Sequence, residues 1–294
     1  MWGRIGGMSM NAAHAARTVR AAALAIGVGL AFATLGASVA TAAEQVQPPR
    51  EKWSFSGPFG KFDPGQLQRG FKVYREVCSN CHSLSMVAFR NLAEEGGPGF
   101  TEAQAKAIAA EYKIKDGPND QGDMFERPGR LSDYFPAPFP NEQAARAANG
   151  GAYPPDMSTL AKARTYERGF PWFVFDIFTQ FQEQGPDYVH AVLVGYEDPP
   201  EGQKPAQATL HYNKYFPGHW IAMPKPIQDG QVEYTDGTPT TVDQYSRDVT
   251  AFMVWAAEPH LVARKRLGLV VMFFLIVFAG LLYFTKRRVW ASAH

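Results

Sequence analysis

The sequence predicts a mostly α-helical domain with long loop insertions, followed by one C-terminal transmembrane helix. Three observations predict this fold class: two segments whose apolar residues recur at helical spacing, long Pro- and Gly-rich stretches between them, and one uninterrupted apolar run near the C-terminus. The chain has 294 residues, with 22 Pro and 27 Gly. With both ends set aside, this length suits one domain that is rich in loops.

The N-terminus is typical of an export signal. Arg17 and Arg20 precede an apolar stretch of small residues over 21–37, and Ala-Thr-Ala at 40–42 matches a small-residue cleavage motif. We therefore expect residues 1–43 to be a cleaved signal peptide, the alternative being a transmembrane helix. Export would place the domain that follows outside the cytoplasm.

Near the C-terminus, 19 residues from Leu267 to Thr285 carry no charge. At about 1.5 Å per residue, this helix spans ~28 Å, close to the ~30 Å hydrocarbon core of a bilayer. Three cations flank it on each side, so the signal peptide and not the charge rule decides the orientation. We predict a membrane anchor with basic flanks over 264–288 and a cytoplasmic tail over 289–294; a buried helix of a soluble domain is the alternative.

Charge is distributed unevenly along the chain. The whole chain has a net charge of +1, but residues 44–263 hold all 28 acidic residues and only 20 of the 29 basic ones, a net of −8. Such a domain attracts basic partners and repels nucleic acid. The candidates for an acidic docking surface, with ordinary solvated loops as the alternative, are Glu94, Glu95, Asp116, Asp120, Asp123, Glu126, Glu197, Asp198 and Glu201.

The only two cysteines, Cys78 and Cys81, lie in the pentapeptide Cys-Ser-Asn-Cys-His that ends at His82. A haem attachment site, a redox-active dithiol and half of a zinc site all contain such a pair. Zinc needs a second pair of ligands, which the sequence lacks, and a dithiol has no use for the adjacent His. Haem attachment uses all three residues, with two thioethers to the porphyrin and His82 on the iron. The motif predicts one covalently attached haem c.

Two amphipathic segments are predicted to form the core of a c-type cytochrome domain around this haem. The first helix and the haem motif occupy residues 67–85, after an extended arm over 44–66. The second helix follows the capping-box pattern that begins at Thr241. Residues 102–112 have helical character, whereas 114–140 are expected to be loop. The expected core positions are Leu67, Phe71, Tyr74 and Val77 of the first helix, and Val249, Phe252, Met253 and Ala256 of the second.

An iron that only transfers electrons needs a sixth ligand, and a thioether sulfur raises the haem potential by favouring Fe(II). Met223 has prolines on both sides, which stiffen a non-helical loop, and it precedes the last helix of the exported domain. We predict Met223 as the sixth ligand. Met124 and Met157 are the other methionines to consider, and His211 and His219 are the nitrogen alternatives.

Beyond the haem motif, nearly all of the chain after the signal resembles the cytochrome c1 family, the haem subunits of quinol–cytochrome c oxidoreductase (cytochrome bc1) complexes. The N-terminus resembles that of alphaproteobacterial members. The resemblance is carried by WSFSGPFGKFD (53–63), RGFKVYREVCSNCHSL (69–84), ARAANGGAYPPDMS (145–158), GPDYVHAVLVGY (185–196), YFPGHWIAMPKPI (215–227) and WAAEP (255–259).

The resemblance implies a single haem c, ligated by His82 and Met223, that receives electrons from a Rieske iron–sulfur protein and passes them to a soluble or tethered cytochrome c. It also implies an Arg that pairs with a haem propionate through two parallel donors; Arg164 matches it, with Arg146 as the alternative. The remaining implied haem-pocket residues are Tyr188, Pro154 and Pro155.

The resemblance further implies cytochrome b, membrane lipid and a dimeric complex as partners. The protein would lie in the bacterial inner membrane as a single-pass subunit, with its haem domain in the periplasm, and would be no enzyme on its own. Rival functions are an anchored cytochrome of a terminal oxidase, a haem peroxidase or gas-binding protein, and an assembly role.

The chain also departs from the family pattern. It lacks a cysteine pair that some members carry, and Trp220 and Lys225 replace residues that are usually smaller or Pro. The Phe-rich stretch 170–184 suits either an amphipathic helix against the membrane partner or an internal core.

Overall fold

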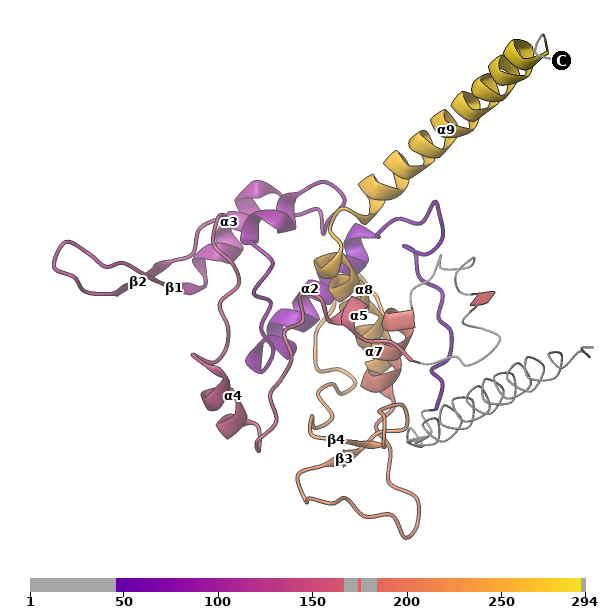
Figure 1. The fold of residues 1–294 in the computed structure, drawn as a ribbon. Coiled ribbons are helices and arrows are strands. Elements are labelled where there is room, and N and C mark those ends of the chain that lie inside the picture. Colours follow the sequence, from indigo (N-terminus) through magenta and orange to yellow (C-terminus); the bar gives the residue numbers. More distant parts are fainter. Residues whose placement is uncertain (1–45, 167–173, 176–183, 292–294) are drawn as a thin grey trace, which may run out of the picture. The chain divides into compact units, whose positions relative to one another are not determined.

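The computed structural model describes residues 46–166, 174–175 and 184–291. The predicted signal peptide and most of the Phe-rich stretch lie outside these residues. The described part is mostly helical, as predicted (Figure 1). Its helices are α2 (Pro64–Glu76), α3 (Glu102–Ala110), α4 (Glu142–Ala148), α5 (Leu160–Ala163), α7 (Gln184–Val194), α8 (Val242–Ala257) and α9 (Leu261–Trp290), with 3-10 turns η1 (Cys78–Asn80) and η2 (Phe89–Ala93). Its strands are β1 (Lys113–Asp116), β2 (Phe125–Pro128), β3 (His211–Tyr212) and β4 (Trp220–Ile221).

Helix α2 begins three residues before the predicted segment because Asp63 caps it. The Asp63 carboxylate accepts a hydrogen bond from the Gly65 N–H at 2.9 Å, and Pro64 occupies the first helical position. The helix ends at Glu76, directly before the haem motif. The predicted face is confirmed at three of its positions, the buried Leu67, Phe71 and Tyr74, whereas Val77 is only partly buried.

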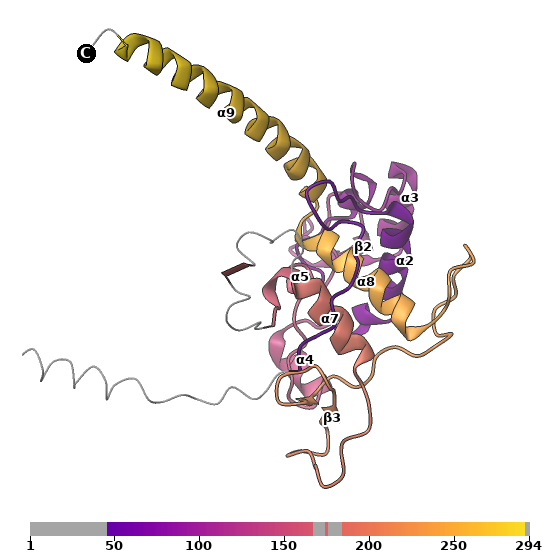
Figure 2. The same ribbon diagram turned by 90° about the vertical axis from the view of Figure 1, so that its right-hand side faces the viewer.

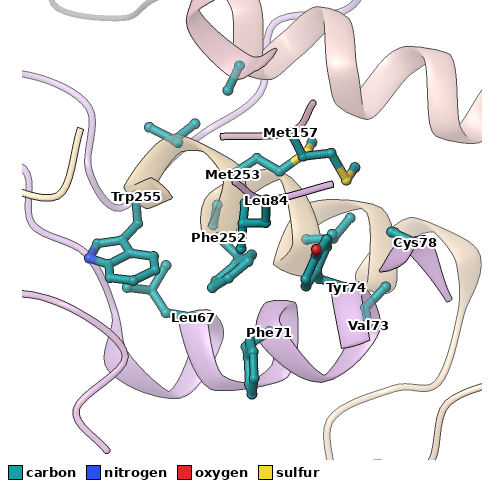
Figure 3. Close-up of a cluster of buried hydrophobic side chains, with 14 of the residues drawn as sticks. Leu67, Phe71, Val73, Tyr74, Cys78, Leu84, Met157, Phe252, Met253 and Trp255 are labelled. Carbon is teal, nitrogen blue, oxygen red and sulfur yellow. The ribbon is translucent and has the colours of Figure 1, made fainter. Parts of the chain in front are cut away.

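Helix α8 confirms the second predicted segment. The Thr241 hydroxyl accepts a hydrogen bond from the Gln244 N–H at 3.3 Å, which is one half of the expected capping box, whereas the Gln244 side chain donates to Asp248 at 2.8 Å. Val249, Phe252 and Met253 are buried to 1% exposure or less. Trp255 is as deeply buried, and Figure 3 shows it at the opposite end of the apolar cluster from Cys78.

Helices α2 and α8 cross at Gly70, where the two backbones approach closely. A Cβ at this position would lie 2.1 Å from the Asp248 carbonyl oxygen and 2.7 Å from the Phe252 Cβ, so no larger residue fits. Phe252 packs against two aromatic residues of α2, with ring centroids 5.7 Å from Phe71 and 5.8 Å from Tyr74. The crossing thus joins the helix that leads into the haem motif to the helix that precedes the anchor.

The expectation of a loop throughout 114–140 is wrong at its start, where β1 and β2 form an antiparallel hairpin. The hairpin is stabilised by charge: the Arg127 guanidinium binds the carboxylate of Asp116 and, at 2.6 Å, that of Asp133. The Arg127 side chain, together with the Gly117 N–H, holds the pKa of Asp116 below its ordinary value. Asp116 is therefore engaged within the hairpin and is the least accessible of the acidic docking candidates on this segment.

Helix α9 contains the predicted anchor. It is the single helix in the described residues that is long and apolar enough to cross a membrane, and none of its apolar window is buried in the protein. Glu258, just before it, binds both Arg264 of α9 and Lys162 of the α5 helix. These ion pairs attach the base of the anchor to the domain.

Candidate haem-binding site

The haem motif folds into one tight turn directly after α2. The Cys78 carbonyl accepts hydrogen bonds from the N–H groups of Cys81 at 3.1 Å and His82 at 2.9 Å. Both thiols and the imidazole are thereby gathered within a single turn. Cys78 is buried beside the core, whereas Cys81 is exposed, and neither forms a disulfide. One thiol therefore lies against the core and the other is open to a bound group.

The thiols do not have the electrostatics of a redox-active dithiol. Such a pair needs a lowered thiol pKa, but burial raises the pKa of Cys78 to about 12. A zinc site is no better supported, because no group of three or more His, Cys, Asp or Glu side chains suited to a metal occurs in the described part of the chain. Both alternatives that the cysteine pair left open are therefore disfavoured.

His82 is prepared to donate a nitrogen lone pair. Its Nδ1 lies 2.8 Å from the Pro155 carbonyl oxygen, which can only accept, so Nδ1 carries the proton and Nε2 does not. Burial lowers the pKa of the imidazole, although the bond to Pro155 opposes this effect. A neutral ring with a fixed tautomer fits the donor that a haem iron requires.

Asp156 holds the backbone on both sides of this hydrogen bond. Its carboxylate accepts from the Ser83 hydroxyl at 2.7 Å and from the Ser85 amide and hydroxyl at 3.0 and 2.7 Å. It also accepts from the Ser158 N–H at 2.7 Å. Burial alone would raise the pKa of Asp156, but these bonds lower it to about 2. We call Asp156, Ser83, Ser85 and Ser158 the Asp156 clamp.

Sequence reasoning missed the Asp156 clamp and gave the neighbouring prolines a different role. Pro154 and Pro155 were expected to wall the haem edge, and the structure adds that the carbonyl of Pro155 orients His82. Main-chain acceptors leave no signal in the sequence. The Ser-rich stretch after the haem motif was the only available hint of a buried acceptor nearby.

Met223 lies in the loop after β4. Its side chain is partly buried and packs against the hydrophobic core, and its carbonyl oxygen accepts a hydrogen bond from the Tyr196 hydroxyl at 2.9 Å. The other methionines are less suitable. Met124 is 63% exposed on the hairpin loop, and the main chain of Met157 is bonded next to His82, through its N–H to the Ser83 carbonyl at 2.9 Å.

The nitrogen alternatives are engaged elsewhere or exposed. His219 stacks on Tyr212, with ring centroids 5.5 Å apart, and adopts a left-handed backbone with φ of 63°. His211 is exposed on β3. These placements favour Met223 among the candidates for the sixth ligand.

Asn213 fixes the hairpin that carries the Met223 loop. It is fully buried, and its side-chain amide donates to the Val192 carbonyl at the end of α7 at 2.7 Å. Its side-chain oxygen accepts from the N–H groups of Tyr215 at 3.1 Å and Phe216 at 3.2 Å. The loop is therefore attached to α7 at its start, ten residues before Met223.

Arg164 and Tyr188 are brought near each other, although their elements are separated in sequence. Tyr188 is buried on α7, and burial raises its pKa while the positive charge of Arg164 opposes the rise. Arg164 is exposed at the end of α5, so its guanidinium is accessible. The alternative, Arg146, binds the Glu142 carboxylate at 2.7 Å and the Gly151 carbonyl at 3.1 Å.

Comparison with known proteins places almost the whole described chain in one family. The sequence profile of the Cytochrome C1 family matches residues 53–293. The chain belongs to the cytochrome c1 family. It is 50% identical over 271 residues to the cytochrome c1 of Blastochloris viridis, with 92% of this chain and 94% of that protein covered.

Two further relatives extend the comparison. The chain is 69% identical over 249 residues to the cytochrome b/c1 of Bradyrhizobium diazoefficiens, with 84% of this chain covered, and it spans only 36% of that protein's length. It is 44% identical over 277 residues to a mitochondrial cytochrome c1 heme protein of Arabidopsis thaliana, covering 93% of this chain and 82% of the other.

Membership of the cytochrome c1 family confirms several expectations together. The family consists of haem subunits of cytochrome bc1 complexes and carries one covalently attached c-type haem. The mostly helical fold and the single apolar C-terminal helix, which fits a single-pass membrane anchor, agree with it. Members of the family are redox subunits of a larger complex.

Proposed function

We propose that this chain takes single electrons from a Rieske iron–sulfur protein and passes them to a cytochrome c, as a subunit of ubiquinol–cytochrome c oxidoreductase. The observation that carries the proposal is the prepared imidazole of His82. Its Nδ1 is bonded to the Pro155 carbonyl at 2.8 Å, and it follows two unpaired thiols within one turn. When bound, the haem iron supplies a one-electron couple.

Four residues of this chain hold the haem in this proposal. The thiols of Cys78 and Cys81 would hold it through thioether bonds to its two vinyl groups. The Nε2 of His82 and the sulfur of Met223 would be its iron ligands. With an imidazole and a thioether as ligands, the iron would have no open position for small molecules, and this subunit would need no bond-making step.

The remaining site residues bind and orient the haem edge. The exposed guanidinium of Arg164 pairs with a propionate, next to Tyr188 in the pocket wall. Pro154 and Pro155 lie at the haem edge, and the carbonyl of Pro155 also holds the axial imidazole.

The proposed partners follow from the anchor and the charge. Helix α9 anchors the chain beside cytochrome b in a dimeric complex of the bacterial inner membrane, with the haem domain in the periplasm. The acidic domain attracts a basic cytochrome c. Of the acidic candidates, Glu197, Asp198 and Glu201 lie together on an exposed loop directly after α7.

Purification of the complex in mild detergent tests this proposal. We expect cytochrome b and a Rieske protein to copurify with the chain, and ubiquinol to reduce its haem. Copurification of copper–haem oxidase subunits in their place would support an anchored cytochrome of a terminal oxidase. High-spin iron in the native protein would support a peroxidase or a gas-binding protein.

A further inference from the structure

An exposed aromatic residue at the base of the membrane anchor has no role in the haem site. Residues 54–61 form a tight loop, closed by a hydrogen bond from the Lys61 N–H to the Ser54 carbonyl at 3.0 Å. Phe59 lies in this loop and is 76% exposed, the largest exposed fraction of any large apolar residue in the described chain. We call residues 54–61 the Phe59 loop.

The loop is built to present this side chain. Two neighbouring Phe residues point inward: Phe55 is 6% and Phe62 is 8% exposed, and their ring centroids are 5.3 Å apart. Gly60 lets the chain turn back, since a Cβ there would lie 2.0 Å from the Ser56 carbonyl oxygen. Two of the three aromatic residues therefore fix the loop, while Phe59 is left projecting from it.

The loop lies at the base of α9. The Lys265 ammonium group donates a hydrogen bond to the Phe55 carbonyl, which joins the loop to the first turns of the anchor. In both ribbon views the segment that precedes α2 passes beside the start of α9 (Figures 1 and 2). Lys265 is two residues before the apolar run that begins at Leu267, about 3 Å along the helix axis.

This position coincides with the polar zone of the bilayer. The headgroup layer adds roughly 5–8 Å on each side of the ~30 Å hydrocarbon core. A loop bonded to Lys265 therefore lies at headgroup depth when α9 spans the membrane. The exposed cations around it, Lys61 and Arg266, suit lipid phosphates, and a projecting aromatic side chain suits the boundary between headgroups and acyl chains.

We propose that the Phe59 loop is a second membrane contact, in which the Phe59 ring inserts at the headgroup–acyl boundary of the leaflet that α9 enters. Removal of the Phe59 ring from water favours this insertion, because the transfer of apolar surface out of water is favourable. A second contact beside the helix restricts the orientation of the haem domain over the membrane. The inference depends on α9 as an anchor and not on the haem.

A spin label tests this directly in the intact complex, reconstituted in nanodiscs of phosphatidylcholine and phosphatidylglycerol. A nitroxide is attached in Phe59→Cys, and Met124→Cys is the matched control, because Met124 is 63% exposed on the hairpin loop. Wild-type complex labelled in parallel gives the background. We expect the ratio of oxygen to nickel-chelate collision rates to be several-fold higher at position 59 than at position 124.

Two results would overturn the proposal. Equal ratios at both positions would place Phe59 in water, and low collision rates with both reagents would place it against another protein subunit. Lys61→Cys, in the same loop, provides the measurement if the Phe59 variant does not assemble, with an intermediate ratio expected. The haem spectrum of each variant reports on the proposed function separately.

Discussion

The two proposed axial ligands are held in different ways. His82 is fixed through its own ring, by the bond from Nδ1 to the Pro155 carbonyl at 2.8 Å, and the Asp156 clamp secures the backbone on both sides of that bond. Met223 is held by hydrogen bonds only through its backbone, by the Tyr196 hydroxyl at 2.9 Å and by the loop that Asn213 attaches to α7. A thioether sulfur accepts hydrogen bonds weakly, so loop geometry and packing against the core position the side chain. Met223 is therefore held less firmly than His82.

The strongest test of this difference removes each ligand in turn. Met223→Leu is expected to retain the covalent haem, to lose the Met–iron charge-transfer band, and to lower the potential by about 0.1 V or more, within the ~0.8 V range that axial ligands span. His82→Ala is expected to reduce the amount of assembled haem protein as well. Pyridine-haem content and potentiometric titration measure both effects. An unchanged band in Met223→Leu would exclude Met223 as a ligand.

The crossing of α2 and α8 supports the turn that carries His82. Gly70 is the most sensitive position of this crossing. Gly70→Ala places a Cβ 2.1 Å from the Asp248 carbonyl oxygen, so we expect a loss of about 1–3 kcal/mol in the free energy of unfolding. Gly65→Ala in the same helix is the control, since its Cβ would be 3.4 Å from the nearest atom. Equal stabilities of the two variants by denaturant unfolding would contradict the close crossing.

Removal of the Asp156 charge is expected to weaken the clamp that holds the backbone around the His82–Pro155 hydrogen bond. Asp156→Asn loses charge-assisted bonds and is expected to cost about 1–3 kcal/mol near neutral pH. The folded pKa of Asp156 is about 2, below its ordinary 3.8, so its stabilising contribution is complete above pH 3.8 and decreases as the pH falls toward 2.

The measurement is the stability difference between wild type and Asp156→Asn as a function of pH. Asp120→Asn, on an exposed loop, serves as the control. A difference that stays constant from pH 6 to pH 2 would show that the charge of Asp156 does not carry the effect.

The smallest expected effect concerns the hydrogen bond that holds the Met223 backbone. Tyr196→Phe removes one hydrogen bond to the Met223 carbonyl, worth about 0.5–1.5 kcal/mol. We expect the Met–iron charge-transfer band to disappear at a lower temperature than in wild type, while the haem remains attached. If the band has the same melting temperature in both proteins, the Tyr196 bond does not position the sulfur.

The sequence predicted the features that depend on residues close together in the chain. The helical stripes around Phe71 and Phe252 and the cap at Thr241 follow from spacing, and all three are present. The turn that gathers Cys78, Cys81 and His82 follows from the motif itself. Each of these features is formed within a short stretch of chain, so neighbouring residues are enough to reveal it.

What the sequence could not reveal depends on residues that are distant in the chain. The Asp156 clamp joins segments 73 positions apart, and the fit of Gly70 against Asp248 depends on a crossing angle. The hairpin around Arg127 was missed because ion pairs, and not an apolar alternation, stabilise it. The carbonyl of Pro155 is a main-chain group, and because every residue has one, the sequence does not indicate which carbonyl binds His82.

Both cysteines are expected to be bound covalently to one haem. The direct measurement is a pyridine haemochrome spectrum of the purified, denatured chain together with a count of its reactive thiols. We expect a c-type spectrum, one haem per chain, and no reactive thiol at Cys78 or Cys81. Two reactive thiols and no Soret absorption would contradict covalent haem attachment at these cysteines.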